Sequence, residues 1–231
     1  MSVYNREGKY ITLLGLGSKT VKELSERMFI SEPTVRRDIK ELAKRDILEC
    51  KRGIVSLKAN AADKRIPLFI RDMEQNEAKN EIALKAKKEI KDGDVLFLDA
   101  STTAYHLIKH LSGFNDIIII TNGAKTALEA AAMGIKTICT GGEMANESFS
   151  YIGPDAERVL ERYNADIAFF SCRGLTEDGI ATDPSILENS ARRIMIKNSK
   201  RRILLCDKEK FGKKFLNTLC NTREIDMVIT D

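Results

Sequence analysis

The sequence lacks the features that would place it outside the cytoplasm or among metalloproteins. It has no tryptophan and only two histidines, and its five cysteines form no C-x-x-C pair, which argues against a disulfide framework or a cysteine-based zinc site. No apolar run reaches the roughly 18 residues of a membrane-spanning helix. Residues 1–9 lack the apolar core of a signal peptide. We therefore expect a cytoplasmic protein with reduced cysteines and with neither a metal nor a cofactor.

The chain has little net charge overall, but its excess of positive charge lies at the N-terminal end. The net formal charge is +4 over 231 residues. Residues 1–60 hold 13 Lys and Arg against 8 Asp and Glu, a net charge of +5, whereas the remaining residues hold 25 against 26, a net charge of −1. A small basic module attached to a nearly neutral body indicates a polyanionic partner for that module.

Two short helices are predicted within the basic module. Residues 20–27 show an apolar stripe at helical spacing, with Ser18 or Thr20 as the N-cap. After a short break, Ser31 offers a second N-cap and Pro33 stands in the first turn of an amphipathic segment. Two short helices joined by a tight turn form a helix-turn-helix, whose second helix enters the DNA major groove with its N-terminal residues nearest the bases.

The second helix and the segment after it supply the candidate DNA contacts. Residues 47–50 and 54–57 flank a Lys-Arg-Gly turn, which predicts a β-hairpin with a basic tip, or wing. Hydroxyl groups suit phosphate oxygens, and arginine can bind guanine with two parallel hydrogen bonds. An ordinary three-helix unit with a solvated charged face is the alternative. The predicted DNA contacts are Ser31, Thr34, Arg36, Arg37, Lys40, Lys51 and Arg52.

The remainder of the chain predicts a second domain built on a mainly parallel sheet. Residues 60–75 show little apolar periodicity and contain Pro67, so they are interpreted as a linker with a short strand or turn at 68–71. A helical pattern runs from Glu77 to the turn at 92–94, and strands then alternate with helices, which is typical of an α/β fold. The helix that follows Thr103 is predicted to reach Leu111. The predicted strands are residues 95–98, 117–120, 137–139, 167–170, 203–206 and 227–230.

Small, hydroxyl and charged side chains follow several of these strands. The carboxyl ends of parallel strands meet at one edge, where ligands bind in open α/β sheets. Ser and Thr before a helix favour an anion, glycines allow close backbone approach, lysine attracts phosphate, and aspartate accepts protons from sugar hydroxyls. Caps and turns favour the same residue types, so a structural role is the alternative. The candidate site residues are Asp99, Ser101, Thr102, Thr103, Thr121, Asn122, Gly141, Gly142 and Lys210.

The chain resembles the DeoR family of sugar-metabolism regulators along nearly its whole length. Residues 31–39, S-E-P-T-V-R-R-D-I, are similar to the family's recognition helix. Shorter matching pieces follow in order: E-I-A at 81–83, D-G-D at 92–94, D-A-S-T-T at 99–103, T-N at 121–122, G-G at 141–142, Gly153, and 207–212. The resemblance implies a regulator, usually a repressor, whose C-terminal domain is similar in fold to ribose-5-phosphate isomerase and glucosamine-6-phosphate deaminase. It also implies that this domain binds a phosphorylated sugar through the candidate site residues.

Two departures from the family pattern bear on these sites. The wing tip has a single glycine, Gly53, where the family usually has two. Glu209 stands where the family's D-x-S-K-F segment has serine. If Glu209 faces the site, its negative charge would change how a phosphate is held.

An enzyme of the related fold is the main alternative function. Asp99, Asp183 and Glu188 are the carboxylates available for acid–base chemistry. His106 and His110 form an H-x-x-x-H pair, which is more typical of a helix face than of a metal site. A third interpretation makes the N-terminal module a protein-interaction surface.

The favoured interpretation is a regulator without enzymatic activity. It predicts a winged helix-turn-helix at residues 1–58, a linker at 59–76 and an α/β effector-sensing domain at 77–231. The expected partners are double-stranded operator DNA, a phosphorylated sugar, and a second copy of the chain in a homodimer or higher homo-oligomer, because one helix-turn-helix usually reads one half-site.

Overall fold

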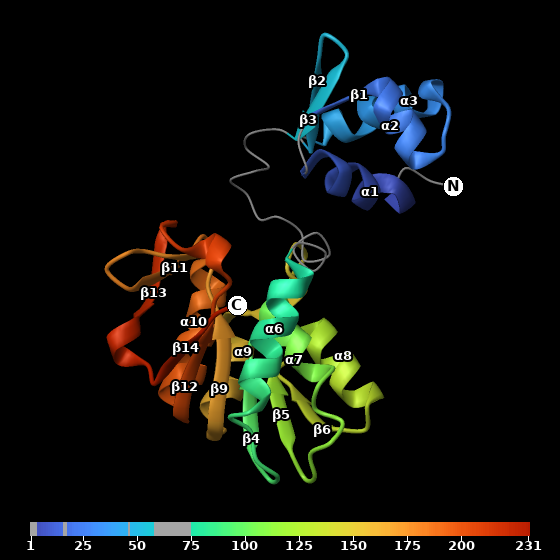
Figure 1. Cartoon of the computed structure of the whole chain (residues 1–231). Helices are drawn as coiled ribbons and strands as arrows, with labels where there is room; N and C mark the ends of the chain where they lie inside the picture. Colours follow the sequence, from blue (N-terminus) through green and yellow to red (C-terminus); the bar gives the residue numbers. More distant parts are fainter. Residues whose placement is uncertain (1–3, 16–17, 46, 58–74) are drawn as a thin grey trace. The chain divides into compact units, whose positions relative to one another are not determined.

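The computed structural model in Figure 1 describes residues 4–15, 18–45, 47–57 and 75–231. The chain divides into two compact units, Met1–Arg71 and Asp72–Asp231. The predicted strand or turn at 68–71 lies outside the described residues, as does most of the predicted linker. Among the described residues, no helix has the length and apolar character needed to cross a membrane.

Three helices and a three-stranded antiparallel sheet make up the described part of the N-terminal unit. The elements are α1 (Tyr4–Gly15), β1 (Lys19–Thr20), α2 (Val21–Met28), α3 (Glu32–Lys44), β2 (Leu48–Lys51) and β3 (Ile54–Leu57), with sheet order β1-β3-β2. Helix α1 was not predicted, because Gly8 lowers its intrinsic helix propensity. It is held instead by tertiary packing, since Tyr10 and Leu14 are buried in the core of the unit.

Helices α2 and α3 confirm the predicted pair, and their caps show why they begin where they do. Thr20 and Glu23 form a capping box: the Glu23 amide donates to Thr20 Oγ1 at 3.2 Å, and the Thr20 amide donates to Glu23 Oε2 at 2.7 Å. Ser31 is the N-cap of α3, but its hydroxyl makes no capping bond and lies 2.9 Å from the Thr34 hydroxyl instead. The predicted hairpin is confirmed as β2 and β3.

A six-stranded parallel sheet forms the centre of the C-terminal unit. The strands are β4 (Val95–Leu98), β5 (Ile118–Thr121), β6 (Lys136–Cys139), β9 (Ala165–Ser171), β12 (Ser199–Leu205) and β14 (Met227–Ile229), in the order β14-β12-β9-β4-β5-β6. All neighbouring pairs are parallel. The six predicted strands are confirmed, although β9 and β12 begin earlier than predicted.

Helices cover both faces of this sheet, as Figure 1 shows. Helices α6 (Asn76–Lys87), α7 (Thr102–Ile108) and α8 (Ala124–Ala132) pack on one face, and α9 (Gly153–Glu161) and α10 (Ile186–Lys197) pack on the other. Along β4, Leu96 and Leu98 face the first core and Phe97 faces the second. Because both of their faces are buried, the central strands β4, β5 and β9 are largely apolar runs, which made them easy to predict, whereas the edge strand β6 is partly exposed.

Helices α6 and α7 end earlier than predicted. The predicted ends were at 92–94 and Leu111, but the helices end at Lys87 and Ile108. The following backbone amides bond three residues back, as in Ile90 to Lys87 (3.2 Å) and Leu111 to Ile108 (3.0 Å). These tighter turns end the α-helices while Ile90 and Leu111 stay buried, so the apolar pattern continues past each end.

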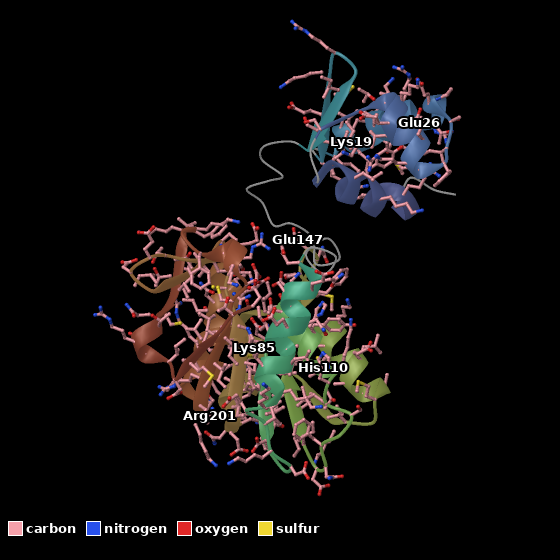
Figure 2. The ribbon with its side chains drawn as sticks, viewed as in Figure 1. Lys19, Glu26, Lys85, His110, Glu147 and Arg201 are labelled. Carbon is pink, nitrogen blue, oxygen red and sulfur yellow. The ribbon has the colours of Figure 1, made fainter. Side chains whose placement is uncertain are left out.

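Short elements follow the carboxyl ends of β6, β9 and β12. They are β7 (Glu143–Ala145) paired with β8 (Ser150–Ile152), an antiparallel sheet of β10 (Gly174–Leu175), β11 (Ile180–Asp183) and β13 (Asn217–Asn221), and the 3-10 turns η1 (Lys208–Lys210) and η2 (Thr222–Glu224). Figure 2 shows Glu147, between β7 and β8, toward the end of the unit where the strands finish, and Arg201 of β12 toward the other end. None of these short strands was predicted.

The order of the strands contains a switch point. The chain adds β5 and β6 on one side of β4, and then β9, β12 and β14 on the other side. The connections leaving β4 and β9 therefore depart in opposite directions. In open α/β sheets the crevice at the carboxyl ends of such a pair is where ligands bind. Asp99 follows β4 and Ser171 ends β9, so both lie at this position.

Candidate functional site

The exposed face of α3 carries basic side chains, three of which are among the predicted DNA contacts. Arg36, Arg37 and Lys40 are exposed, whereas Val35 and Ile39 on the opposite face are buried. Their only described ion pair is Arg36 with Glu32 at 3.3 Å, and both side chains remain largely in solvent. An exposed pair of this kind is weak. The charges on this face are therefore available to a polyanion.

The β2–β3 hairpin carries two more basic residues at its tip. Arg52 and Gly53 occupy the two turn positions with φ of 52° and 78°, as a type I′ turn requires. Lys51 pairs with Glu49 at 2.9 Å while its side chain stays 77% exposed. The single glycine of this tip therefore serves a tight two-residue turn that presents Lys51 and Arg52 to solvent.

Asp38 lies on the inner side of α3 and anchors the helix to α1. Its carboxylate accepts hydrogen bonds from Arg6 Nε at 2.7 Å, from Arg6 Nη2 at 2.8 Å and from the Tyr10 hydroxyl at 3.2 Å. Asp38 is 1% exposed. Burial, and then the charge of Asp38, raise the pKa of Tyr10, so its hydroxyl remains a donor. Sequence reasoning missed this anchor because Arg6 and Asp38 are far apart in the chain.

Phe29 begins the turn between α2 and α3 in an unusual conformation. It is the C-cap of α2 with φ 55°, a left-handed conformation that costs a non-glycine residue about 1 kcal/mol or more. Its side chain is 93% exposed. This strained aromatic residue therefore lies in solvent immediately before the start of α3.

Asp99 is the centre of a buried polar cluster at the switch point. Oδ1 accepts bonds from the amide and hydroxyl of Ser101 at 3.1 and 2.5 Å, and Oδ2 accepts bonds from the Ser171 amide at 3.2 Å and Arg192 Nε at 2.8 Å. Asp99 is 0% exposed. These four bonds use its acceptor capacity, so here the carboxylate organises the site rather than facing a sugar hydroxyl.

Arg192 of α10 joins three carboxylates and was missed by sequence reasoning. Besides Asp99, its guanidinium bonds to Asp183 at 2.9 Å and to Glu188 at 3.2 Å. Burial lowers the pKa of Arg192, but the charges of Asp183, Asp99 and Glu188 outweigh burial, so the pKa lies above its ordinary value. The carboxylates considered for acid–base chemistry therefore converge on one permanently charged group.

Lys210 reaches the same edge from η1. Its ammonium group lies 2.9 Å from Asp207 Oδ2, 3.0 Å from Ser171 Oγ and 3.3 Å from Thr103 Oγ1. The side chain is 17% exposed. The structure therefore brings together Lys210, Thr103 and the Asp99 cluster, with Ser171 as a further member that the sequence did not single out.

Ser101 and Thr121 use their hydroxyls within the fold. Ser101 caps α7 by accepting from the Ala104 amide at 3.1 Å, and Thr121 accepts from the Gly123 amide at 2.9 Å. Helix α7 is only seven residues long, and Thr102 lies buried in its first turn. The contacts of Ser101 and Thr121 therefore match the structural alternative, in which these residues form a helix cap and a turn.

Asn122 is the one predicted residue with a buried polar atom lacking a partner among the described residues. Its amide nitrogen donates to the Tyr151 carbonyl at 3.1 Å, which fixes the orientation of the amide. Its Oδ1 is buried without a hydrogen bond in that part of the chain. A buried acceptor left without a donor is costly, so this atom is suited to a ligand hydroxyl.

Strand β8 closes a ring of contacts around these groups. Ser150 bridges to Gly123 after β5, and its hydroxyl donates to Glu188 Oε1 at 3.2 Å. Glu188 in turn meets Arg192 and hence Asp99. The ends of β4 and β5 are thereby connected through β8 and α10.

The two glycines after β6 differ in their surroundings. Both have positive φ, 62° for Gly141 and 105° for Gly142. A Cβ on Gly142 would lie 3.1 Å from the Ala156 amide nitrogen and 3.2 Å from the Ile152 oxygen, whereas nothing lies within 4 Å of one on Gly141. Gly142 therefore allows close packing against α9, and Gly141 is the glycine whose backbone is open to an approaching group.

The structure answers two questions left by the sequence. Glu209 is exposed, and its nearest described cation is Lys213 at 3.9 Å, so its carboxylate does not join the contacts of Lys210. His106 lies in α7, but His110 lies beyond its end and contacts Asn80 of α6 at 2.8 Å. In the described ranges, no three His, Cys, Asp or Glu side chains gather as a metal site would require.

Each unit matches the model of a known protein family. The family model for the DeoR C terminal sensor domain matches residues 74–231, and that for the DeoR-like helix-turn-helix domain matches residues 11–59. The HTH-type transcriptional regulator GolR of Listeria innocua is 33% identical, covering 100% of this chain and 91% of that protein. The glycerol-3-phosphate regulon repressor of Escherichia coli (strain K12) is 27% identical, covering 93% and 85%.

Solved structures add a likeness of the fold. The eIF2B delta subunit of Chaetomium thermophilum matches with a TM-score of 0.52 at 17% identity, covering 70% of this chain and 58% of that chain. Ribose 5-phosphate isomerase A of Methanocaldococcus jannaschii matches with a TM-score of 0.46 at 19% identity, covering 60% and 55%. At 17% identity, the match with the eIF2B delta subunit shows a likeness of the fold alone.

Proposed function

Because the chain belongs to the DeoR family of transcription regulators, we propose that it represses a sugar-metabolism operon by binding operator DNA through α3 and the β2–β3 hairpin. A phosphorylated sugar, bound at the carboxyl ends of β4, β5 and β12, modulates this binding. The protein acts in the cytoplasm as a homodimer or larger homo-oligomer, since each helix-turn-helix reads one half-site. The named relatives include a repressor of the glycerol-3-phosphate regulon.

The observation that carries the DNA-binding role is the arrangement of α3. Its exposed face holds Arg36, Arg37 and Lys40, while its inner face is locked to α1 through Asp38. A helix held rigidly with a basic outer face presents its charges to the phosphates and bases of a major groove without further ordering. Ser31 and Thr34, at the start of the helix, would contact phosphates through their hydroxyls.

The effector role is supported by polar groups at the switch point that could still contact a ligand. Lys210 supplies a positive charge beside the hydroxyls of Thr103 and Ser171, and Asn122 supplies a buried acceptor without a described donor. A phosphate oxygen would replace one of the hydroxyl contacts of Lys210, and a sugar hydroxyl would donate to Asn122 Oδ1. In this proposal Asp99 and Arg192 hold the site in shape.

The enzyme alternative gains no support from the cluster. A general base needs a carboxylate oxygen that can take a proton from substrate. Here Asp99, Asp183 and Glu188 each bond to Arg192, and these bonds occupy carboxylate oxygens that a general base would need.

The DNA-binding proposal is tested with the DNA sequence that the full chain selects from a random pool. We expect Arg36→Ala or Arg37→Ala to weaken binding by roughly 1–3 kcal/mol, and binding by the unaltered chain to fall steeply with salt. Lys88→Ala, an exposed residue of the C-terminal unit, serves as the matched control. Unchanged affinity in both arginine variants would show that α3 is not the reading helix.

The effector proposal is tested by thermal unfolding against a panel of sugar phosphates and the matching sugars without phosphate. A ligand present at about 100 times its dissociation constant stabilises the folded chain by about 2.7 kcal/mol. We expect Lys210→Met to lose the ligand-induced shift relative to its own unliganded midpoint, and the exposed neighbour Lys208→Met to keep it. A full shift in the Lys210 variant would remove this residue from the site.

A further inference from the structure

Cys172 and Cys206 place two thiols side by side near the switch point. They directly follow β9 and β12, which pair in parallel with Ser171 opposite Leu205. The two Sγ atoms lie 3.9 Å apart. Cys172 is 3% exposed and Cys206 is 0% exposed, so a reagent that oxidises them must be small.

The backbone spacing is compatible with a bond between them. Neighbouring strands lie about 4.8 Å apart. This is inside the roughly 4.4–6.8 Å separation of Cα atoms that a disulfide spans. The sulfurs must approach from 3.9 Å to about 2.05 Å. Because both strands end at the preceding residue, rotation of the side chains needs no rearrangement of the ladder.

The surroundings assign different roles to the two thiols. The hydrogen bond with Cys206 lowers the pKa of Cys172, and against the effect of burial the charge of Lys210 lowers it further. The hydrogen bond with Cys172, and then burial, raise the pKa of Cys206. Cys172 also keeps some exposure, 3% against 0% for Cys206, and it directly follows Ser171, whose hydroxyl lies 3.0 Å from the Lys210 ammonium group. Since the thiolate is the nucleophile, Cys172 is assigned as the attacking thiol and Cys206 as the resolving one.

We propose that Cys172 and Cys206 form a reversible disulfide in response to hydrogen peroxide. The Cys172 thiolate attacks one peroxide oxygen, the O–O bond breaks, and the departing hydroxide takes a proton and leaves as water, which gives a sulfenic acid on Cys172. Cys206 Sγ then attacks Cys172 Sγ, and the sulfenic hydroxyl leaves as water with the Cys206 proton. The two thiols lose two electrons and one peroxide becomes two waters.

The position of the pair gives this modification a consequence. Ser171 precedes Cys172 and Asp207 follows Cys206, and both contact the ammonium group of Lys210, at 3.0 and 2.9 Å. Closing the Sγ atoms from 3.9 Å turns the two side chains toward each other, and this local change beside Ser171 and Asp207 is expected to shift their contacts with Lys210. Oxidation is therefore expected to weaken binding of a phosphorylated ligand, a consequence that rests on the proposed function, whereas formation of the disulfide does not.

The test treats the full chain with hydrogen peroxide, blocks the remaining thiols, and maps tryptic peptides by mass spectrometry. We expect residues 163–173 linked to residues 203–208, about 2 Da lighter than the two peptides together and released by dithiothreitol. The rate should not depend on protein concentration. Recovery of both cysteines as thiols or as sulfinic acids, while exposed Cys50 and Cys139 react, would overturn the proposal.

Variants separate the two steps and the contribution of Lys210. Cys206→Ser should leave a sulfenic acid on Cys172 that dimedone traps, and Cys220→Ser should keep the disulfide. Lys210→Gln should slow the reaction roughly three- to tenfold through loss of its charge, and Lys208→Gln should not. Absence of a dimedone adduct on folded Cys206→Ser would reject Cys172 as the attacking thiol.

Discussion

The charged residues of α3 and those at the switch point of the sheet are arranged in opposite ways. On α3, Arg36 and Arg37 lie in solvent with at most a weak exposed pair. At the switch point, Asp99 and Arg192 are buried and bonded to each other at 2.8 Å. Exposed charges can be lost with little cost to folding, whereas buried charges are held only as a complete set. The first region is therefore expected to tolerate substitution, and the second to fail when one member is removed.

Removing Arg192 is the most severe way to test this contrast. Arg192→Met leaves Asp99, Asp183 and Glu188 without their shared cation, and we expect a loss of about 3–5 kcal/mol in the free energy of unfolding. Urea unfolding followed by far-ultraviolet circular dichroism measures it. Arg158→Met, which removes an exposed arginine of α9 that pairs with Asp155, should change stability by less than about 0.5 kcal/mol. Equal effects in the two variants would contradict the contrast.

A substitution at Asp38 tests whether the N-terminal unit also depends on buried charges that bond to each other. Asp38→Asn weakens the paired bonds from Arg6 and leaves that charge poorly matched, so we expect a loss of about 2–3 kcal/mol. Glu41→Gln changes an exposed carboxylate of the same helix and is expected to have little effect. Thermal unfolding of the full chain distinguishes them. If Asp38→Asn proved as mild as the control, α3 would not depend on its anchor to α1.

Phe29 offers a change in the stabilising direction. Phe29→Gly removes the left-handed strain of a bulky residue and an exposed ring, and we expect a gain of about 1 kcal/mol in the free energy of unfolding. Chemical unfolding measures the gain, and Phe29→Ala, which keeps the strain, is the control. A loss of stability in the glycine variant would mean that the ring makes contacts that this conformation does not show.

Glu209 should give the smallest effect. Its carboxylate is exposed and faces Lys213, so Glu209→Ser, the residue of the family pattern, is expected to change ligand-induced stabilisation by less than about 0.5 kcal/mol. The thermal-shift panel described for Lys210 gives the measurement. A large gain in phosphate response would show that Glu209 approaches the ligand site when it is occupied.

Local patterns predicted α2, α3, the hairpin and the parallel strands, whereas α1, the short strands and the long-range contacts were missed. The caps at Thr20 and Ser31 and the apolar strands located α2, α3 and the parallel sheet, because each signal lies within a few neighbouring residues. Arg192 and Ser171 were missed, since their roles depend on strands and helices that only the fold brings together. The polar residues that follow the strands do lie at one edge of the sheet, and their role there in binding a ligand stays a prediction. The residue types alone did not show that the hydroxyls of Ser101 and Thr121 accept hydrogen bonds from backbone amides.

The anchor of α3 also bears on how such a protein diversifies. Asp38 secures the helix from its inner face, while Thr34, Arg36, Arg37 and Lys40 share no bond with that anchor. Mutations on the outer face can therefore accumulate without unfolding the unit. Under the proposed function, a duplicated copy of the gene could acquire a new DNA target by changing a handful of codons, with the scaffold that presents them left intact.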